Sequence, residues 1–242
     1  FCIDRFITHS SIMFRRFEIN SGLTYSVDLP LAENLSYKYK YLLADSLINA
    51  ASGRKDEFIA GRACALLALS DLGSGSPIVK THKSRRPIWP EGFTGSISHT
   101  KDFALASVYN KNDIRSVGID CETLILPDRF DKIKDYITRK EDLVLLETDK
   151  EAQVSLVQTL IFSAKEALYK TINPLCDEFF GFQDAYISSI DSDKENFTIV
   201  LDSKIEKLKQ YNAVYCGKFK TTKNQIITSI ELKNIPDSLT IS

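Results

Sequence analysis

The sequence predicts an α+β fold, in which neighbouring strands pair as hairpins and the helices lie in separate segments. Four short apolar segments divided by polar turns follow one another at 185–190, 197–201, 213–219 and 225–232. Two further strand-like segments, 103–109 and 115–122, are joined by the turn-like residues 110–113. The helical patterns fall outside these runs instead of alternating with single strands, which argues against a parallel α/β sheet.

The composition indicates an ordinary globular chain with enough apolar residues for a sizeable core. Of the 242 residues, 43% are hydrophobic and 26% are charged. The 31 Lys and Arg residues nearly balance the 32 Asp and Glu residues. No overall field therefore draws the protein to nucleic acid or to an anionic membrane, and any anion site must be local. No apolar run approaches the roughly 18 residues that cross a bilayer, so we expect no transmembrane segment.

The five cysteines are scattered, and no pair has the spacing of a zinc site. This pattern favours a reducing, cytoplasmic environment over a secreted scaffold held by disulfides. The chain length lies between that of one large domain and that of two small ones. If there are two lobes, we expect the join near residues 113–118.

Two helices are predicted in the first half of the chain. One covers 42–51, and the other covers 54–72, where Phe58, Ala65 and Leu69 recur at helical spacing. A Gly-Ser-Gly-Ser-Pro sequence follows the second helix and ends it. The glycines and prolines beyond it predict a long loop that runs to about residue 95.

A long helix is predicted in the second half, after the charged segment 128–147, which should be helical in part. Thr148 and Glu151 fit a capping box, in which the side chain of each satisfies a free amide of the other. The helix should end near residue 171, because Pro174 follows and disfavours helical backbone just before it.

Asp120 and Glu122 form the first candidate site. Side chains two residues apart project from the same face of a strand, so both carboxylates can converge on one ion. Mg²⁺ prefers oxygen ligands and typically takes one or two carboxylates plus substrate phosphate. The alternative is a strand end with two solvated acids, which a short Asp-x-Glu motif alone does not exclude.

The long helix of the second half carries the second candidate site. Glu166 and Lys170 lie one turn apart on the same face, together with Phe162, and Lys165 lies about 100° round the helix from Glu166. Such a helix can offer a carboxylate to a metal and two ammonium groups to phosphates. The alternative is an exposed helix with one ion pair, which contributes only about 0.3–0.5 kcal/mol.

Hydrogen-bond donors gather in the short segment 95–100. Gly95 permits a close backbone approach, while Ser96, Ser98 and His99 supply donors. Adjacent Ser and His residues raise a hydrolase nucleophile as an alternative, but the Gly-x-Ser-x-Gly elbow of that class is missing here. Contact with a phosphate or ribose is the interpretation that we favour.

Basic residues form the fourth pattern. Arg54 and Arg62 lie about two turns apart on similar faces of the 54–72 helix. The loop that follows adds Lys80, Lys83, Arg85 and Arg86. Arginine suits bidentate binding of phosphate, although a solvated charged face remains the alternative when this cluster is taken alone.

Together and in this order, the four patterns resemble the 4'-phosphopantetheinyl transferases, in particular the enterobactin-synthetase component D branch. The resemblance covers residues 54–170. The matching residues are Arg54 with Gly61-Arg62, Pro87-Ile-Trp-Pro with Gly95-Ser-Ile-Ser-His99, Gly118-Ile-Asp-Cys-Glu122, and Phe162-Ser-Ala-Lys-Glu166 with Lys170. Each motif is weak by itself, but the ordered set is specific.

The resemblance implies two similar α+β lobes, residues 1–115 and 116–242, related by pseudo-twofold symmetry with the active-site cleft between them. It implies a Mg²⁺-dependent enzyme that moves the 4'-phosphopantetheine group of coenzyme A to a serine of an apo carrier protein, releasing adenosine 3',5'-bisphosphate. The internal symmetry makes a monomer the expected state.

The resemblance also assigns roles to the site residues. Asp120 and Glu122 would hold Mg²⁺, with Glu166 as a further ligand or as the base that takes the serine proton. Lys170, with Lys165 as a second candidate, would contact the pyrophosphate. The other residues implied in coenzyme A binding are Arg54, Arg62, Lys80, Arg86, Ser98 and His99.

The implied partners are carrier domains of nonribosomal peptide, polyketide or fatty-acid synthases. The tryptophan-proline loop points to siderophore, antibiotic or other nonribosomal-peptide pathways. One alternative is a transferase dedicated to the fatty-acid acyl carrier protein. Another is a coenzyme A-binding module without activity, against which the intact Asp120, Glu122, Glu166 and Lys170 set argues.

Overall fold

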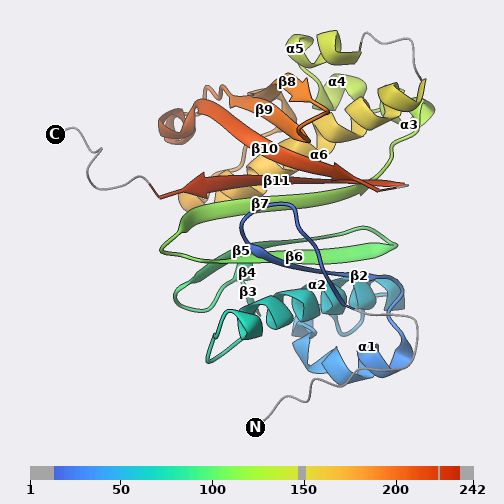
Figure 1. The fold of residues 1–242 in the computed structure, drawn as a ribbon, viewed down its shortest axis with the longest axis vertical. Helices are drawn as coiled ribbons and strands as arrows, with labels where there is room; N and C mark the ends of the chain where they lie inside the picture. Colours follow the sequence, from blue (N-terminus) through green and yellow to red (C-terminus); the bar gives the residue numbers. More distant parts are fainter. Residues whose placement is uncertain (1–13, 147–150, 223, 235–242) are drawn as a thin grey trace, which may run out of the picture.

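Two antiparallel sheets, each covered by one long helix, make up most of the fold in the computed structural model of the chain (Figure 1). The structure describes residues 14–146, 151–222 and 224–234. Of the helices in this part of the chain, not one combines the length and apolar character that a bilayer span requires.

The first sheet has the strand order β1-β2-β6-β5. Its strands are β1 (Arg15–Arg16), β2 (Leu23–Asp28), β5 (Phe93–His99) and β6 (Phe103–Asn110), and the separate hairpin beside it consists of β3 (Lys80–Thr81) and β4 (Pro87–Ile88). Helix α2 (Ser52–Asp71) covers this sheet, and α1 (Glu33–Tyr39) packs against α2. Fully buried alanines, among them Ala60, Ala63 and Ala68, let α2 lie close to the strands.

The second sheet has the order β7-β11-β10-β9-β8, with every neighbouring pair antiparallel. Its strands are β7 (Ile114–Thr123), β8 (Ala185–Asp191), β9 (Asn196–Leu201), β10 (Ala213–Thr221) and β11 (Gln225–Lys233). Helix α6 (Glu151–Cys176) covers β7 and β11. The short helices α3 (Pro127–Asp131), α4 (Lys134–Ile137) and α5 (Lys140–Leu143) connect β7 to α6.

The two sheets pack against each other, so that the order of layers is α2, first sheet, second sheet, α6 (Figure 1). Alternation along β6 shows this directly, because Ala104 and Ala106 face α2 whereas Leu105 packs with Ile119 and Ile227 of the second sheet. Strand β6 is therefore buried on both faces. Its sequence is almost entirely apolar for that reason.

Serine side chains join the edge of β5 to β7, although the two strands belong to different sheets. The hydroxyl of Ser96 accepts a hydrogen bond from the Ile119 amide at 3.0 Å, and that of Ser98 accepts one from the Cys121 amide at 3.2 Å. These buried amides need partners. The first sheet is thereby held in register with the strand that carries the predicted acidic pair.

The expected combination of helices with antiparallel hairpins is confirmed. The predicted strands at 103–109, 115–122, 185–190, 197–201, 213–219 and 225–232 and the helix at 54–72 are all present, with ends shifted by a few residues. The segment 128–147 is helical in part, as expected. The pseudo-twofold relation and the division between 1–115 and 116–242 stay predictions.

Three local predictions are wrong. The predicted helix at 42–51 is replaced by 3₁₀ turns at Lys40–Leu42 and Asp45–Leu47, because Leu43 and Ala44 between them are extended. The predicted long loop contains the β3–β4 hairpin, and β5 begins at its end.

The third error concerns the end of α6, which runs past Pro174 to Cys176 instead of ending near residue 171. Pro174 lies in the last turn, where it removes one helical hydrogen bond, and the Asp177 amide still bonds to the Asn173 carbonyl at 2.8 Å. The predicted cap residue Thr148 lies outside the described residues.

Gly118 allows β7 to approach α6 closely, and we expect Gly118→Ala to destabilise the fold. A Cβ atom there would lie 1.8 Å from the Ala167 carbonyl oxygen and 2.5 Å from Thr171 Oγ1. Overpacking of this kind costs about 1–3 kcal/mol or more, which urea denaturation would measure. The matched control is Gly53→Ala in α2, where a Cβ meets no atom within 4 Å. Equal stability of Gly118→Ala and the parent protein would contradict this packing.

Candidate functional site

Asp120 of β7 lies where both sheets and α6 meet, and its side chain is the centre of the site. It is only 3% exposed. Ser98 Oγ and Lys170 Nζ donate to its Oδ1 at 3.0 and 2.7 Å, and Ser163 Oγ donates to its Oδ2 at 2.9 Å. The carboxylate thus binds β5 and α6 at once.

Lys170 supplies the positive charge that Asp120 faces. Its ammonium also donates to Ser98 Oγ at 3.0 Å and to the Ile119 carbonyl at 3.2 Å, while about a quarter of the side chain, 27%, stays exposed. Burial by itself would lower the pKa of Lys170, but the ion pair and hydrogen bond with Asp120 outweigh it and the pKa is raised. Lys170 therefore remains charged, and part of its side chain stays exposed.

Glu122 and Glu166 flank this pair, and both are partly buried. Burial, followed by the charges of Asp120 and Glu166, raises the pKa of Glu122 to about 7, although Lys170 opposes the shift. Burial and then Asp120 also raise the pKa of Glu166. The three acids predicted from two distant segments thus lie within electrostatic reach of one another.

The donors in this group suit a hard divalent cation, since they are carboxylate oxygens that repel one another. In the present arrangement, however, the described residues contain no three His, Cys, Asp or Glu side chains grouped closely enough to hold a metal ion. Asp120 is instead engaged by its serine and lysine donors. The metal-ligand assignment of Asp120, Glu122 and Glu166 accordingly remains a prediction.

Arg54, Glu57 and His99 form a second polar group at the start of α2. Arg54 Nη1 donates to Glu57 Oε2 at 3.0 Å and to His99 Nε2 at 2.9 Å. Because Nε2 accepts, Nδ1 is the protonated nitrogen of a neutral imidazole, and it lies 3.6 Å from Glu57 Oε2. Burial lowers the pKa of His99, which Glu57 partly opposes. Arg54 and His99, two of the residues implied in coenzyme A binding, therefore lie in contact with each other.

Arg62 lies deeper in the same helix and is 7% exposed. Its guanidinium sits 3.8 Å from the centre of the Phe58 ring and donates from Nη2 to Thr81 Oγ1 at 3.2 Å, whereas its buried Nε has no hydrogen-bond partner. Burial and the nearby Arg54 lower the pKa of Arg62 to about 10. An unpaired buried N–H is costly, so this group favours an anion as its partner.

A pocket of about 390 Å³ separates the loop before β5 from the end of α6. Its lining includes Arg86, Trp89, Gly95, Ser96, Tyr169 and Lys170. Trp89 packs so closely on Gly95 that a Cβ there would lie 2.7 Å from its ring. Arg86 pairs loosely with Asp177 at 3.5 Å across the pocket. Lys80, on β3, is exposed and adjoins the Thr81 that binds Arg62.

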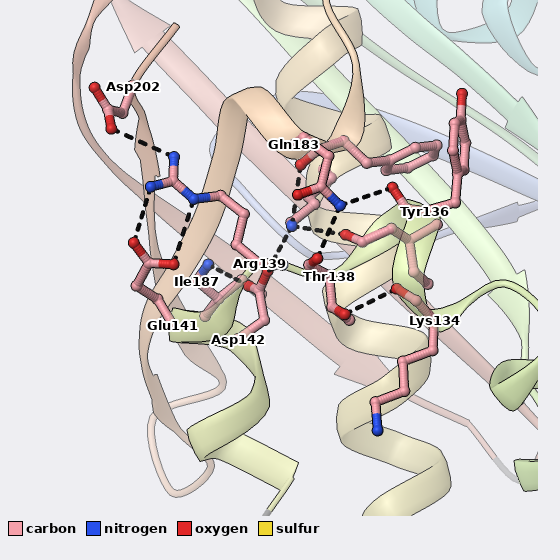
Figure 2. Close-up of polar contacts among 12 residues, drawn as sticks. Lys134, Tyr136, Thr138, Arg139, Glu141, Asp142, Gln183, Ile187 and Asp202 are labelled. Carbon is pink, nitrogen blue, oxygen red and sulfur yellow. Dashed lines mark hydrogen bonds and ion pairs between the residues drawn. The ribbon is translucent and has the colours of Figure 1, made fainter.

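Lys165, the second candidate for phosphate contact, is not available for it, and that prediction is wrong. The side chain is 2% exposed, and its ammonium donates to Asp142 Oδ2 at 2.6 Å and to the carbonyls of Ile137 at 2.8 Å and Phe182 at 3.1 Å. Lys170 also has three acceptors, but 27% of its side chain is exposed, so the enclosure of Lys165 by protein is what keeps it from a phosphate. Figure 2 shows the network around Asp142 to which it belongs.

Two features of the site escaped sequence reasoning. Ser163 binds Asp120, and its position one turn before Glu166 and two turns before Lys170 is the signal that would have found it. The second feature is a pocket of about 280 Å³, here called the aromatic pocket. Its lining is Tyr136, Lys165, Glu166, Tyr169, Phe179, Phe180, Gly181 and Phe182.

Comparisons with known proteins agree along most of the chain. A model for the N-terminal domain of 4'-phosphopantetheinyl transferases matches residues 44–109, and a model for the 4'-phosphopantetheinyl transferase superfamily matches residues 116–226. The chain is 35% identical to 4'-phosphopantetheinyl transferase Npt of Nocardia iowensis over 56% of this chain and 59% of that protein.

Two further relatives show the same extent of similarity. The chain is 35% identical to 4'-phosphopantetheinyl transferase PptT of Mycobacterium tuberculosis over 60% of this chain and 63% of the relative. It is 32% identical to enterobactin synthase component D of Salmonella typhi over 61% of this chain and 60% of that protein. The chain thus spans about three fifths of the length of the curated relatives that it matches.

The raised pKa of Glu122 predicts how stability depends on pH in metal-free buffer. The unfolded chain ionises this group near pH 4.5 and the folded protein near pH 7, so its favourable contribution is complete below pH 4.5 and is lost as the pH rises through 7. Glu122→Gln cannot ionise, and we expect it to exceed the parent in unfolding free energy by roughly 2–3 kcal/mol at pH 8. The two proteins should be equal near pH 4.5 in urea denaturation.

Glu141→Gln is the control with the opposite sign. Hydrogen bonds from a backbone amide and from Arg139 lower the pKa of Glu141, so its favourable contribution is present above the unfolded pKa and is lost in acid. This variant should be less stable than the parent at neutral pH, with the difference disappearing as the pH falls. A Glu122→Gln profile parallel to that of the parent would disprove the interpretation of Glu122.

Proposed function

The chain belongs to the 4'-phosphopantetheinyl transferase superfamily, and we propose that it moves the 4'-phosphopantetheine group of coenzyme A to a serine of an apo carrier protein. Adenosine 3',5'-bisphosphate is the other product. The observation that carries the proposal is the Lys170–Asp120 ion pair, whose atoms lie 2.7 Å apart. Glu122 and Glu166 lie near this pair, and Lys170 also lines the pocket of about 390 Å³ that contains Arg86. A diphosphate needs such a combination of cations and metal-binding acids.

The cationic groups at the start of α2 favour the nucleotide end of coenzyme A. Arg62 Nε is buried without a partner, and Arg54 and His99 are already oriented toward each other by Glu57. In this proposal they bind the adenosine 3'-phosphate. Arg86, from the loop that lines the pocket of about 390 Å³, and the exposed Lys80 complete the set.

The reacting end lies at Lys170. Its ammonium is held by Asp120, Ser98 and the Ile119 carbonyl, so it is already ordered when a pyrophosphate oxygen replaces or shares one of these acceptors. Mg²⁺, held by Asp120 and Glu122 with Glu166 nearby, would supply further neutralisation of the charge on the pyrophosphate. The carrier serine attacks the β-phosphorus, and the bond to the leaving adenosine bisphosphate breaks.

Glu166 is the proposed acceptor of the serine proton. Its raised pKa makes the carboxylate a stronger base than an exposed glutamate, and its location on the aromatic pocket leaves it accessible to a substrate. General-base assistance typically contributes about 10²–10⁴-fold. Glu166 can act in this role and as a neighbour of the metal at once.

The carrier is proposed from the relatives. Enterobactin synthase component D carries the name of a siderophore synthase, which favours siderophore or nonribosomal-peptide carriers over the fatty-acid acyl carrier protein. The partly exposed Lys170 beside three acids argues for an active enzyme over a coenzyme A-binding module. A cytoplasmic, monomeric protein remains our expectation.

Replacement of Asp120 should abolish transfer. Asp120→Ala removes the anchor of Lys170 and a proposed metal ligand, and we expect a loss of at least about 10²-fold in rate, the scale of one preorganised electrostatic group. Mass spectrometry of an apo carrier incubated with coenzyme A and Mg²⁺ measures the added phosphopantetheine. The control is Asp128→Asn, an exposed acid on α3. Parent-like turnover of folded Asp120→Ala would remove this role.

Discrimination between coenzyme A and dephospho-coenzyme A tests the 3'-phosphate site. The parent should prefer coenzyme A, and Arg54→Ala should lower kcat/KM for it by about 10- to 100-fold, because a hydrogen bond to a charged group contributes about 1.5–3 kcal/mol. The same variant should leave turnover of dephospho-coenzyme A nearly unchanged. Arg15→Ala, a surface arginine paired with Asp28, serves as control. An equal loss with both substrates would place Arg54 elsewhere in the mechanism.

A further inference from the structure

We propose that the buried Lys165–Asp142 ion pair positions the wall of the aromatic pocket beside Glu166 and thereby supports transfer to the carrier. Lys165 thus acts through the structure and does not touch the substrate. The inference rests on the proposed function, because it assigns the aromatic pocket to the reaction.

The pair is buried and fully bonded. The side chains of Lys165 and Asp142 are 2% and 0% exposed. Besides accepting from Lys165, the Asp142 carboxylate accepts from the backbone amides of Arg139 and Ile187, each at 2.8 Å (Figure 2). An ion pair with every donor and acceptor satisfied holds its neighbours in one arrangement.

Three segments meet at this pair. Lys165 belongs to α6, Asp142 belongs to α5, and Ile187 belongs to β8. Gln183 adds a second tie, since its Nε2 donates to the carbonyls of Tyr136 at 3.1 Å and Thr138 at 2.8 Å (Figure 2). It also donates to the carbonyl of residue 135 at 3.1 Å. Hydrogen bonds therefore join the segment that connects β7 to α6 both to α6 itself and to β8 and the residues just before it.

The segments joined by these hydrogen bonds include aromatic residues that line the aromatic pocket. Tyr136 meets Phe182 edge-on with ring centres 5.5 Å apart, and Phe182 stacks on Phe162 at 5.2 Å. Helices α4 and α5 have four residues each, too few to be stable by themselves. The place of Tyr136 in the pocket lining that it shares with Glu166 thus depends on these ties, and Lys165 is the residue next to Glu166 in α6.

The core beneath α6 does not depend on the pair. Fully buried apolar residues of the helix, such as Leu160, Ile161 and Leu168, pack on Ile199 and Ile230 of the second sheet. Loss of the ion pair should therefore loosen the segment 134–143 and leave the sheet intact. This local effect separates a positioning role from a general structural one.

The experiment compares Lys165→Met and the double variant Asp142→Asn/Lys165→Met with Ile199→Ala. In the double variant both charges are absent, and the amide of residue 142 still offers an acceptor to a backbone N–H, so that folding is retained. The control removes a fully buried side chain of β9 that does not line the aromatic pocket. Hydrogen exchange follows the amides of 134–143, and transfer to an apo carrier gives kcat and KM.

For both variants of the pair, we expect exchange in 134–143 to quicken at least tenfold while the β9–β11 amides stay protected. The kcat/KM for the carrier should fall at least tenfold, and the Kd for coenzyme A should change less than threefold. Ile199→Ala should lower the melting temperature but keep parent kinetics per folded molecule.

Parent-like exchange in 134–143, or parent-like carrier kinetics, in the double variant would overturn the proposal. So would a loss of activity that only follows the unfolded fraction, as in the control. Absence of any transfer by the parent protein would instead reject the proposed function, and hydrogen exchange would still test the local tie.

Discussion

The hydrogen-bonded ion pair between Asp120 and Lys170 is the contact on which the arrangement of the site depends. It joins β7 to α6, and through Ser98 it also reaches β5 of the first sheet. Removing one partner of such a pair leaves the other charge without compensation in a poorly solvated place. The two sheets and the long helix are consequently held together at the point where the acidic and cationic groups meet.

Uncharged groups on neighbouring strands and on α6 hold Asp120 in position for this contact. Ser96 and Ser98 bind the amides of Ile119 and Cys121, so β7 keeps its register against β5. Gly118 brings the same strand against Ala167 of α6. A strand held on two sides cannot rotate its side chains, so Asp120 faces the helix while Ile119 and Cys121 stay in the core between the sheets.

The periodicity of the sequence was sufficient to predict which of the acidic and basic side chains share a face of one strand or one helix. Alternation predicted that Asp120 and Glu122 share a face of one strand, and the i,i+4 relation placed Glu166 with Lys170. Periodicity could not predict tertiary contacts. Ser163 donates a hydrogen bond to Asp120 only because β7 packs against α6 at that point. Strand β5 was missed because its glycine and serines indicate a loop until the partner strands that bind them are known.

The two lysines of α6 show why one helix can carry both a site residue and a structural one. Five residues at about 100° each place Lys165 and Lys170 roughly 140° apart round the helix, whereas Glu166 lies only about 40° from Lys170. One pyrophosphate therefore could not readily meet both ammonium groups. Lys170 points to β5 and β7, where part of it remains exposed. Lys165 points to α5, where Asp142 and two carbonyls accept from its ammonium and only 2% of the side chain is exposed. Their different roles follow from helix geometry, because the direction in which each ammonium leaves α6 decides whether it meets solvent or the protein interior.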